Sequence, residues 1–501
     1  MPHQPRRQFI GLSTSALAGA LVPGPVKRLF APPTAEITVH LTQSLGEIAP
    51  TIYGQFIEHL GRAIYGGIYD EQHRQFRPDV LEKVQRLRPP LLRYPGGTVT
   101  KIYHWKDGVG QNRPVRKNLI WGGYDTNQVG TDEFVQYARL LGAAPFLTVN
   151  MSTGTAEEAA DWVEYCNATQ GYYAAQRQAN GHAAPYQVKY WGLGNEEAAK
   201  EDAGRLQDPR DYVKQAWYYA KLMKLQDPTI QLIMVGDKPD WNQQILQELH
   251  PICDYISLHL YANSKPGDPA SLFASIAEME VAIKTTAAQI KALTPERVTG
   301  FSKWYRFPSR QQPVKIALDE WGIWENGGKG AYDLEVDYTW NHALGVATFL
   351  NIFQRNAAVI GLATWAQTVN VLAPIMTNET TSICQTIYYP MELYRRLCGP
   401  RSVAATTTGA ATLDVSASTD GKTLTLAIVN RDSTAAITVK INAKVAGRWI
   451  AHELNAPSVA AMNTLQAPDT NVVSYKQRTL LASATTYTVA AHGITLLQAA
   501  L

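Results

Sequence analysis

Short apolar runs alternate with longer amphipathic stretches from about residue 50 to residue 370. Apolar runs bounded by polar residues favour strands, and apolar residues that recur at helical spacing favour helices. We expect strands at Ile52–Phe56, Leu91–Tyr94, Phe146–Asn150, Tyr190–Leu193, Leu232–Val235, Tyr255–Leu258, Ile316–Leu318 and Leu362–Trp365. We expect helices between them, including Val80–Leu87, Thr131–Leu141, Ala156–Ala168, Asp211–Gln226, Leu272–Leu293 and Tyr338–Gln354.

Eight strands interleaved with helices are typical of a (β/α)₈ barrel, the TIM-barrel fold of the α/β class. A doubly wound open sheet is the main alternative, but no GxGxxG or phosphate-binding loop follows any of these strands. We therefore assign residues 49–398 to a barrel domain.

The pattern changes near Ala405, where helical spacing gives way to alternating or apolar runs with Thr-rich flanks. Asp420-Gly421 separates two of these runs as a hairpin turn would. We expect a C-terminal β-sandwich over residues 399–501, and residues 35–48 should join it because Glu36–Leu41 alternates like an edge strand. The expected strands are Leu413–Ala417, Leu424–Val429, Ile437–Ile441, Trp449–Glu453 and Tyr487–Leu497.

The first 34 residues resemble a twin-arginine export signal followed by a Pro-rich linker. Arg6-Arg7 and Phe9 precede an apolar run from Ile10 to Val22. This run is short and rich in Ala, Gly and Ser, which argues against a membrane anchor. We expect an exported protein, periplasmic or secreted, without a membrane partner.

Composition narrows the function classes further. The formal net charge of +3 over 501 residues, without a basic patch of interleaved aromatics, argues against a nucleic-acid partner. None of the four cysteines lies in a CxxC or Cys/His spacing, so we expect no metal site, no cofactor and free, buried thiols. These cysteines are Cys166, Cys253, Cys384 and Cys398.

Polar residues follow the expected strands at the point where each strand ends. In a barrel these ends meet at one face, where catalytic groups lie, so we interpret them as one pocket. The residues are Glu58-His59, Arg93, Asn150, Asn195-Glu196, His259, Tyr261, Glu320-Trp321 and Gln367.

Two of these glutamates suit glycoside hydrolysis, which needs one carboxyl as acid and one carboxylate across the anomeric carbon. Glu196 is the candidate acid/base, with Asn195 beside it, and Glu320 is the candidate nucleophile, which Arg93 would keep ionised. Glu197 and Asp319 are rivals, because adjacent side chains on a strand point to opposite faces. The spacing alone does not choose between the members of each pair.

A series of motifs resembles the α-L-arabinofuranosidases of glycoside hydrolase family 51, in the order that the family has them. The series runs from Ile52 to the end of the barrel domain, and Val429-Asn430-Arg431 extends it into the sandwich. The motifs are Tyr53–Tyr69, Arg93-Tyr94-Pro95-Gly96-Gly97, Trp105–Gly110, Leu193-Gly194-Asn195-Glu196, Ser257-Leu258-His259, Asp319-Glu320-Trp321, Gln367–Ile375 and Gln385–Pro390.

This resemblance implies a retaining mechanism with Glu196 as acid/base and Glu320 as nucleophile, and so chooses between the adjacent carboxylates. The substrate would be a terminal arabinofuranose on arabinan or arabinoxylan. Family members need no metal, and bacterial members are often homohexamers. The resemblance also implies that Glu58, Asn195 and Gln367 bind the furanose hydroxyls, and that His259 and Tyr261 support the nucleophile and ring.

The sequence departs from the family pattern at two places beside the pocket. Thr98 stands where the family usually has a sugar-binding Asn, and Glu197-Ala198-Ala199 replaces the common Met-Asp-Gly. Substrate-binding Thr98 and the altered loop keep two alternatives open: a related exo-furanosidase or xylosidase, such as a galactofuranosidase, and a non-catalytic sugar-binding protein. Retention of both glutamates argues against the last.

The aromatic segment Phe301–Phe307 lies between a helix and the next strand, on the barrel face away from the pocket. We interpret it as a subunit contact of a homo-oligomer. Packing against its own barrel is the alternative.

Overall fold

The computed structural model describes residues 34–199, 206, 208–265, 267–293, 312–325, 327–480 and 485–501. The expected export signal and the Phe301–Phe307 segment lie outside these ranges. Within them, every helix is too short or too polar to cross a lipid bilayer.

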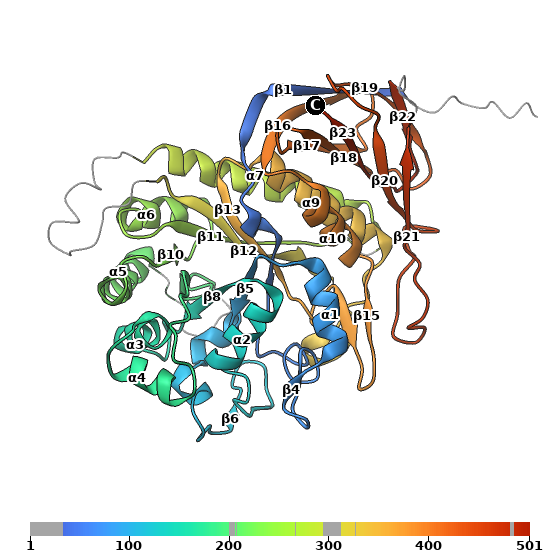
Figure 1. Ribbon diagram of the computed structural model, residues 1–501. Helices are drawn as coiled ribbons and strands as arrows, with labels where there is room; N and C mark the ends of the chain where they lie inside the picture. The colour runs from blue at the N-terminus through green and yellow to red at the C-terminus, as the bar shows by residue number, and fades with distance from the viewer. Residues whose placement is uncertain are drawn as a thin grey trace, which may run out of the picture. The chain divides into compact units, whose positions relative to one another are not determined.

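Eight parallel strands close into a barrel, which confirms the predicted fold (Figure 1). The last strand pairs with the first through Thr364–Gly54 and Ala366–Phe56, so the sheet has no free edge. In chain order the strands are β2 (Gly54–Phe56), β5 (Leu91–Tyr94), β8 (Ala144–Val149), β9 (Tyr190–Leu193), β10 (Gln231–Met234), β11 (Tyr255–Ala262), β12 (Lys315–Ile323) and β13 (Ile360–Ala366).

Helices follow the strands and cover the outside of the barrel (Figure 1). Local capping explains several of their starts: the side chain of Thr155 accepts from Glu158 N, and that of Asp208 accepts from Arg210 N. The six predicted helices form as α1 (Pro78–Leu87), α2 (Thr131–Leu141), α3 (Ala156–Asn167), α5 (Pro209–Gln226), α7 (Ser271–Lys291) and α9 (Trp340–Arg355). The structure adds α4 (Tyr172–Ala179), α6 (Pro239–Leu249) and α10 (Tyr388–Leu397).

The barrel has an inner and an outer apolar layer. Leu91, Phe146, Ile233, Ala317 and Leu362 form a small cluster of their own, one side chain from each of five strands. The larger cluster lies between strands and helices, as where Trp321 of β12 packs on Phe349 and Phe353 of α9. These layers hold the strand ends rigidly, which is what a catalytic site requires.

The C-terminal domain is a nine-stranded sheet that folds over on itself. Strands near its two ends share one apolar core, in which Trp449 and Ala451 lie with Val439 and Val489, so the sheet forms two layers as the predicted sandwich does. The sheet order is β21 (Ser474–Thr479), β20 (Ile450–Asn455), β23 (Ile494–Ala500), β18 (Thr423–Asn430), β17 (Leu413–Thr419), β16 (Arg401–Thr408), β1 (Thr34–Glu47), β19 (Ile437–Asn442) and β22 (Thr486–Val489).

Three details of this sheet differ from the sequence expectation or extend it. The run Tyr487–Leu497 forms two strands, because the chain turns between Val489 and Ile494. β16 and β21 are additional strands. β1 pairs with β16 and β19, which places the N-terminal strand inside the C-terminal sheet.

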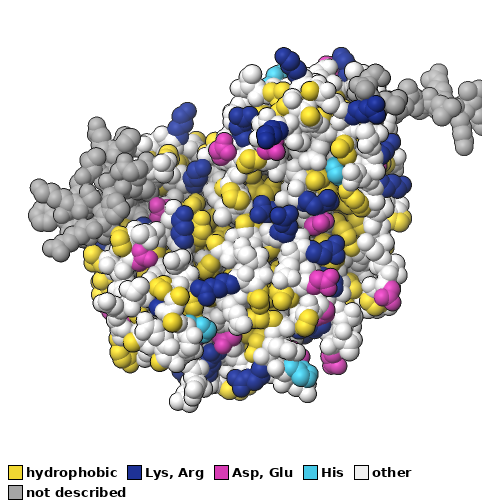
Figure 2. Space-filling model, viewed as in Figure 1, with side chains coloured by type: hydrophobic (Ala, Val, Ile, Leu, Met, Phe, Trp, Pro, Cys, Tyr) yellow, Lys and Arg dark blue, Asp and Glu magenta, His cyan; other side chains and the backbone are white. Residues whose placement is uncertain are grey.

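Charged side chains are spread over the molecular surface. Figure 2 shows Lys and Arg side chains distributed over one face with Asp and Glu among them. All four cysteines are free, as predicted; Cys166 and Cys253 are buried, whereas Cys384 and Cys398 are half-buried.

Candidate active site

The ends of the barrel strands surround a cavity of about 530 Å³. Six of the predicted site residues line it: Glu58, Thr98, Glu196, Tyr261, Glu320 and Gln367. Asn150 does not. Its side chain accepts hydrogen bonds from Ser152 N and Thr153 N and so holds a turn, which is the ordinary role of Asn at such a position.

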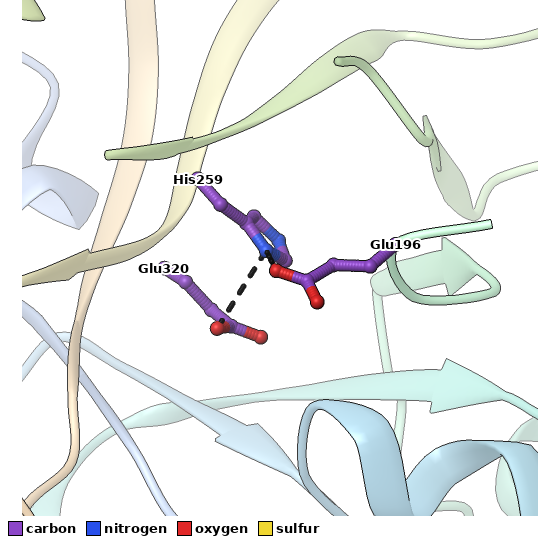
Figure 3. A group of neighbouring side chains, drawn as sticks. All are labelled: Glu196, His259 and Glu320. Carbon is purple, nitrogen blue, oxygen red and sulfur yellow. Dashed lines mark hydrogen bonds and ion pairs between the residues drawn. The ribbon is translucent and has the colours of Figure 1, made fainter. Parts of the chain in front are cut away.

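Glu196 and Glu320 face each other across this cavity, with His259 between them (Figure 3). Glu196 follows β9 in a left-handed backbone conformation with φ +48°, an unusual geometry for a side-chain-bearing residue that is common at functional sites. One carboxylate oxygen of each glutamate and one ring nitrogen of His259 all lie within 4.8 Å of one another.

His259 lies closer to Glu196 than to Glu320. Its Nδ1 is 2.8 Å from Glu196 Oε1 and 3.6 Å from Glu320 Oε2. Burial alone would lower the pKa of His259, but the charges of Glu320, Glu196 and Asp319 and the hydrogen bond to Glu196 raise it to about 9. Burial alone would raise the pKa of Glu196. The hydrogen bond from His259 and the charge of that ring outweigh burial, so the pKa of Glu196 is lowered.

Glu320 is held at both carboxylate oxygens. Arg93 Nη1 donates to Oε1 at 2.7 Å, and Tyr261 Oη donates to Oε2 at 2.8 Å. Arg93 is fully buried and lies over the ring of Phe56, with its guanidinium carbon 4.8 Å from the ring centroid. The nucleophile candidate therefore has a fixed orientation toward the cavity.

Arg93 also orients Asn195. Its Nη2 donates to Asn195 Oδ1 at 2.7 Å, so the amide nitrogen Nδ2 points elsewhere. Although it is buried, Nδ2 has no partner among the residues that the structure describes. A buried donor without a partner costs free energy unless a ligand satisfies it. Asn195 Nδ2 is thus a hydrogen-bond donor left for a substrate hydroxyl.

The two rival carboxylates have other partners. Glu197 turns away from the cavity and lies 3.0 Å from Lys101 Nζ. Asp319 stays inside the barrel, where Ser257 Oγ donates to it at 2.5 Å, but it does not line the cavity. The expectation that Asp319 and Glu320 point to opposite faces is wrong, because the register of β12 shifts between Leu318 and Trp321 and breaks the alternation.

Glu58 binds three donors at the opposite wall. Val99 N and Trp121 Nε1 donate to Oε1 at 3.0 and 2.9 Å, and Gln367 Nε2 donates to Oε2 at 3.0 Å. Burial, reinforced by the charge of Glu320, raises the pKa of Glu58 to about 7. The other amide atom, Gln367 Oε1, is buried, has no partner within the described part of the chain, and is available to a sugar hydroxyl.

Two glycines allow the chain to pass close to the carboxylates of Glu320 and Glu58. A Cβ atom at Gly97 would lie 2.7 Å from Glu320 Oε1, and one at Gly96, where φ is +155°, would lie 2.3 Å from Glu58 Cγ. Neither position could carry a side chain without moving a site residue. Thr98, the next residue, lines the cavity.

One group of site residues has the spacing of metal ligands. Among the described residues, Glu196, His259 and Glu320 are the group of His, Cys, Asp and Glu side chains close enough together to share an ion. The hydrogen bonds from His259 to Glu196 and from Tyr261 and Arg93 to Glu320 already use these groups.

Sequence reasoning missed part of the cavity wall. Leu119, Ile120, Trp121 and Trp324 line it but lie in connections between elements, where neither strand-end position nor periodicity marks a residue. Lys101, the partner of Glu197, is missed for the same reason. The run of Leu119-Ile120-Trp121 in an otherwise polar connection was the one available signal.

The fold is a closed (β/α)₈ barrel, and two carboxylates face each other across the cavity at the carboxyl ends of its strands. Together these features define the class of the protein as a glycoside hydrolase. Comparison with known proteins names the family. The model of the α-L-arabinofuranosidase 1 domain matches residues 83–279, and that of the α-L-arabinofuranosidase C-terminal domain matches residues 319–492.

Similar proteins agree with this match. A probable α-L-arabinofuranosidase C from Aspergillus clavatus is 40% identical over 389 residues, which cover 72% of this chain and 74% of the relative. An intracellular exo-α-(1→5)-L-arabinofuranosidase from Halalkalibacterium halodurans is 35% identical over 386 residues, covering 71% and 74% of the two chains.

Solved structures extend the likeness to the whole fold. The α-L-arabinofuranosidase of Thermotoga maritima in complex with arabinose superposes with a TM-score of 0.84 at 34% identity, covering 93% of this chain and all of the other. The family 51 enzyme of Thermotoga petrophila gives 0.83 at 34% identity, covering 93% and 99%. The chain belongs to the α-L-arabinofuranosidases of glycoside hydrolase family 51, and it is a hydrolase that acts on α-L-arabinofuranosides.

Proposed function

We propose that the enzyme is a retaining, exo-acting α-L-arabinofuranosidase in which Glu196 is the acid/base and Glu320 the nucleophile. The observation that carries this proposal is the approach of the two carboxylates, with oxygens within 4.8 Å across one cavity. Retaining glycosidases hold their carboxyl groups roughly 5 Å apart, whereas inverting enzymes leave room for a water molecule between them.

In the first step Glu320 attacks the anomeric carbon while the glycosidic oxygen departs with a proton from Glu196. The C–O bond to the leaving group breaks, and an ester between Glu320 and the arabinofuranosyl group forms. In the free enzyme this proton lies in the hydrogen bond between Glu196 Oε1 and His259 Nδ1, which are 2.8 Å apart. Arg93 and Tyr261 hold the attacking carboxylate in place.

In the second step Glu196, now a carboxylate, takes a proton from a water molecule that attacks the same carbon. The ester to Glu320 breaks and arabinose leaves with its original anomeric configuration. Asn195 Nδ2 and Gln367 Oε1 are both buried without a partner from the described residues, and they hold the sugar hydroxyls during both steps.

A terminal arabinofuranose on an arabinan- or arabinoxylan-type glycan is the proposed substrate. A cavity of about 530 Å³ suits a small ligand held at a chain end rather than a long polymer held along its length. The exo-α-(1→5) activity in the name of the Halalkalibacterium halodurans relative agrees with this substrate.

A related exo-furanosidase activity is the second candidate, because Thr98 lines the cavity where the family usually has Asn. Threonine offers a shorter side chain and one hydroxyl instead of an amide. Rates on aryl α-L-arabinofuranoside, β-D-galactofuranoside and β-D-xylopyranoside would separate the two candidates. The first candidate requires the arabinofuranoside to have the highest kcat/KM.

The catalytic roles are tested with Glu196→Ala and Glu320→Ala. Each variant should lose roughly 10³-fold or more in kcat on a substrate with a poor leaving group. With 2,4-dinitrophenyl α-L-arabinofuranoside, azide should rescue Glu196→Ala and yield the α-azide, because azide attacks the glycosyl-enzyme ester. Azide should rescue Glu320→Ala by direct attack and yield the β-azide.

Glu197→Gln and Asp319→Asn serve as matched controls, since they alter the neighbouring carboxylates. Neither should give an azide product. If the two azide configurations were exchanged, the two roles would be exchanged as well. If Glu196→Ala and Glu320→Ala both kept wild-type activity, the proposed mechanism would fail.

We also propose that the protein is exported through its Arg6-Arg7 signal and that it assembles as a homo-oligomer. The motif and the family resemblance support these two proposals. Arg6→Lys/Arg7→Lys should leave the protein in the cytoplasm of an expressing bacterium, and sedimentation should give a mass several times 55.3 kDa. Export of the double variant, or a monomer at all concentrations, would contradict the respective proposal.

A further inference from the structure

A strap of chain that follows β12 closes one side of the catalytic cavity. This strap, residues 327–337, is a narrow hairpin in which Lys329 N donates to the carbonyl of Glu335 at 3.0 Å and Glu335 N donates to that of Lys329 at 2.7 Å. Tyr332 lies at its tip. Tyr332 and the next residue, Asp333, both have left-handed backbone conformations with φ +56°. Such conformations persist where the surrounding structure fixes them, so the tip has a defined shape.

Two contacts fasten the strap to the loops that follow neighbouring strands. After β13, Leu372 N donates to the carbonyl of Leu334 at 2.9 Å. After β2, Arg62 donates from Nε and Nη2 to the two carboxylate oxygens of Glu335, at 2.9 and 2.6 Å. In the closed barrel β13 and β2 lie between β12 and β5. The strap therefore runs along the ends of β13 and β2 toward the hairpin that follows β5.

Tyr332 completes the crossing by contacting that hairpin. Its hydroxyl donates to the carbonyl of Ile120 at 3.0 Å, and its ring meets the ring of Trp121 edge-on, with centroids 5.0 Å apart. The side chain is 55% exposed, so burial of its ring contributes little to the stability of the core. What the contact does is to hold the strap against the hairpin.

The side that the strap closes is opposite the proposed acid. In the closed barrel β9, which is followed by Glu196, lies across from β13, which is followed by Gln367. The leaving group must depart beside the acid, so the rest of the sugar points toward β13 and β2. In a furanose ring the atoms farthest from the anomeric carbon are C3 and C4, and C4 carries the exocyclic arm. This arm therefore faces the apolar wall where Leu334, Leu372 and Ile120 line the cavity.

We propose that Tyr332 is a specificity-determining residue. By holding the strap against the hairpin, it closes the cavity beyond the exocyclic arm and restricts the enzyme to a terminal, unsubstituted arabinofuranose. An arabinofuranose inside a (1→5)-linked chain carries a further sugar on this arm and would meet the wall. A galactofuranose would meet it too, because its arm is longer by one CH(OH) group. The inference rests on the proposed exo action and names the residue that enforces it.

The test compares two substrates that differ only at this arm, 4-nitrophenyl α-L-arabinofuranoside and its 5-O-methyl ether. The wild type should prefer the unsubstituted substrate by roughly 50-fold in kcat/KM, and Tyr332→Ala, in which the wall can yield, by only about fivefold. On the unsubstituted substrate kcat/KM of Tyr332→Ala should fall by less than about threefold, because Asn118 still holds Trp121. A residue that served stability alone would lower both rates by the same factor.

Two further variants serve as matched controls. Tyr332→Phe keeps the ring against Trp121 and removes only the hydrogen bond to Ile120, so its preference should lie between those of the wild type and Tyr332→Ala. Tyr124→Ala removes a 73% exposed tyrosine from the same hairpin and should leave the preference at the wild-type value. An unchanged preference in Tyr332→Ala would overturn the proposal. An equal fall in Tyr124→Ala, or a wild type that hydrolyses both substrates equally well, would overturn it as well.

Failure of the exo action is seen separately, with linear α-(1→5)-arabinohexaose. Arabinose as the first product of the wild type supports the exo action, whereas early release of longer oligosaccharides would refute both the exo action and the role of Tyr332. Arabinose as the first product, together with an unchanged preference in Tyr332→Ala, would refute the role of Tyr332 alone.

Discussion

At the scale of single residues, one imidazole governs the protonation of the site. His259 lies within 3.6 Å of carboxylate oxygens from Glu196, Glu320 and Asp319, and three negative charges around one ring favour its protonated form. The proposed acid Glu196 therefore shares a proton with His259, because its own pKa is lowered by the hydrogen bond and charge of that ring. This differs from the common arrangement in which burial alone keeps a catalytic carboxyl protonated.

His259 gives a pH prediction with a definite sign. The pKa of His259 is raised to about 9, so the pair loses its last proton, and kcat/KM should fall, as the pH rises through about 9. In His259→Gln the proton must reside on Glu196 alone, and the alkaline limb should move to lower pH by at least about one unit. A pH profile of kcat/KM on an alkyl arabinofuranoside measures this, and an unchanged limb would contradict the shared proton.

Glu58 gives a prediction about stability. Its pKa is raised from an ordinary 4.5 to about 7, so the folded state binds a proton that the unfolded state has lost between these pH values. Its stabilising contribution is present below about 4.5 and is lost as the pH rises through about 7. Glu58→Gln should be more stable than the wild type at pH 8, by about 3 kcal/mol, and equally stable at pH 4.

The Glu58→Gln amide can be accommodated, because the free Gln367 Oε1 can accept its hydrogen bond after the Gln367 amide turns over. Urea unfolding at pH 4 and pH 8 measures the effect. Asp70→Asn, on an exposed turn with its own His73 partner, is the control, and it should show no gain at pH 8. Equal stabilities of Glu58→Gln and wild type at both pH values would refute the raised pKa.

At the scale of elements, a β-hairpin positions the wall of the cavity. The strands β6 (Arg116–Lys117) and β7 (Tyr124–Asp125) flank the turn that carries Trp121. Asn118 holds this turn, because its Oδ1 accepts from Trp121 N at 2.8 Å and its Nδ2 donates to the carbonyl of His59 at 2.9 Å. The hairpin is thereby attached to the loop that carries Glu58.

Asn118→Ala should loosen this hairpin and withdraw Trp121 from Glu58. We expect KM to rise roughly tenfold, which corresponds to about 1.4 kcal/mol, with a smaller change in kcat. Asp420→Ala removes the same kind of turn contact in the β17–β18 hairpin, where Asp420 Oδ1 accepts from Lys422 N and Thr423 N, and should leave KM unchanged. Steady-state kinetics of both variants measure KM and kcat. A wild-type KM in Asn118→Ala would contradict the role of Asn118 in holding Trp121 at the cavity wall.

At the scale of the whole molecule, α9 joins the barrel to the C-terminal sheet. Arg355 on this helix donates to Asp414 Oδ1 and to the carbonyl of Val415, both at 2.9 Å, and to Glu280 of α7 at 3.1 Å. One guanidinium thus neutralises a carboxylate from each side of the junction. The sheet thus supports the helix that packs against β12, the strand that carries the proposed nucleophile Glu320.

Arg355→Met should destabilise the protein by about 3 kcal/mol, because the half-buried carboxylates of Asp414 and Glu280 lose their shared cation. Arg478→Met removes an exposed partner of Glu453 and should cost less than about 1 kcal/mol. Urea unfolding measures both, and kcat of folded Arg355→Met should stay at the wild-type value. A loss no larger than that of Arg478→Met would show that the junction does not depend on this contact.

The amino-acid sequence by itself determined the barrel and most of its site. Each strand is a local apolar run, and polar residues at strand ends need no long-range information to be recognised, so Glu58, Asn195, Glu196 and Gln367 could be named in advance. Helices α4, α6 and α10 and the strands β16 and β21 were missed. All six residues of β21 are exposed, so no burial pattern marks it.

Only the tertiary structure decided how neighbouring side chains divide their roles. The register shift in β12 turns both Asp319 and Glu320 inward, and it arises from the pairing of β12 with β11 and β13. The pairing of Lys101 with Glu197, the approach of His259 to Glu196 and the contact of Trp121 with Glu58 likewise join residues from separate loops. Local pattern specifies the strands and their ends, whereas charge pairing and proton sharing depend on distances of a few ångströms between distant segments, which exist only once the barrel has closed.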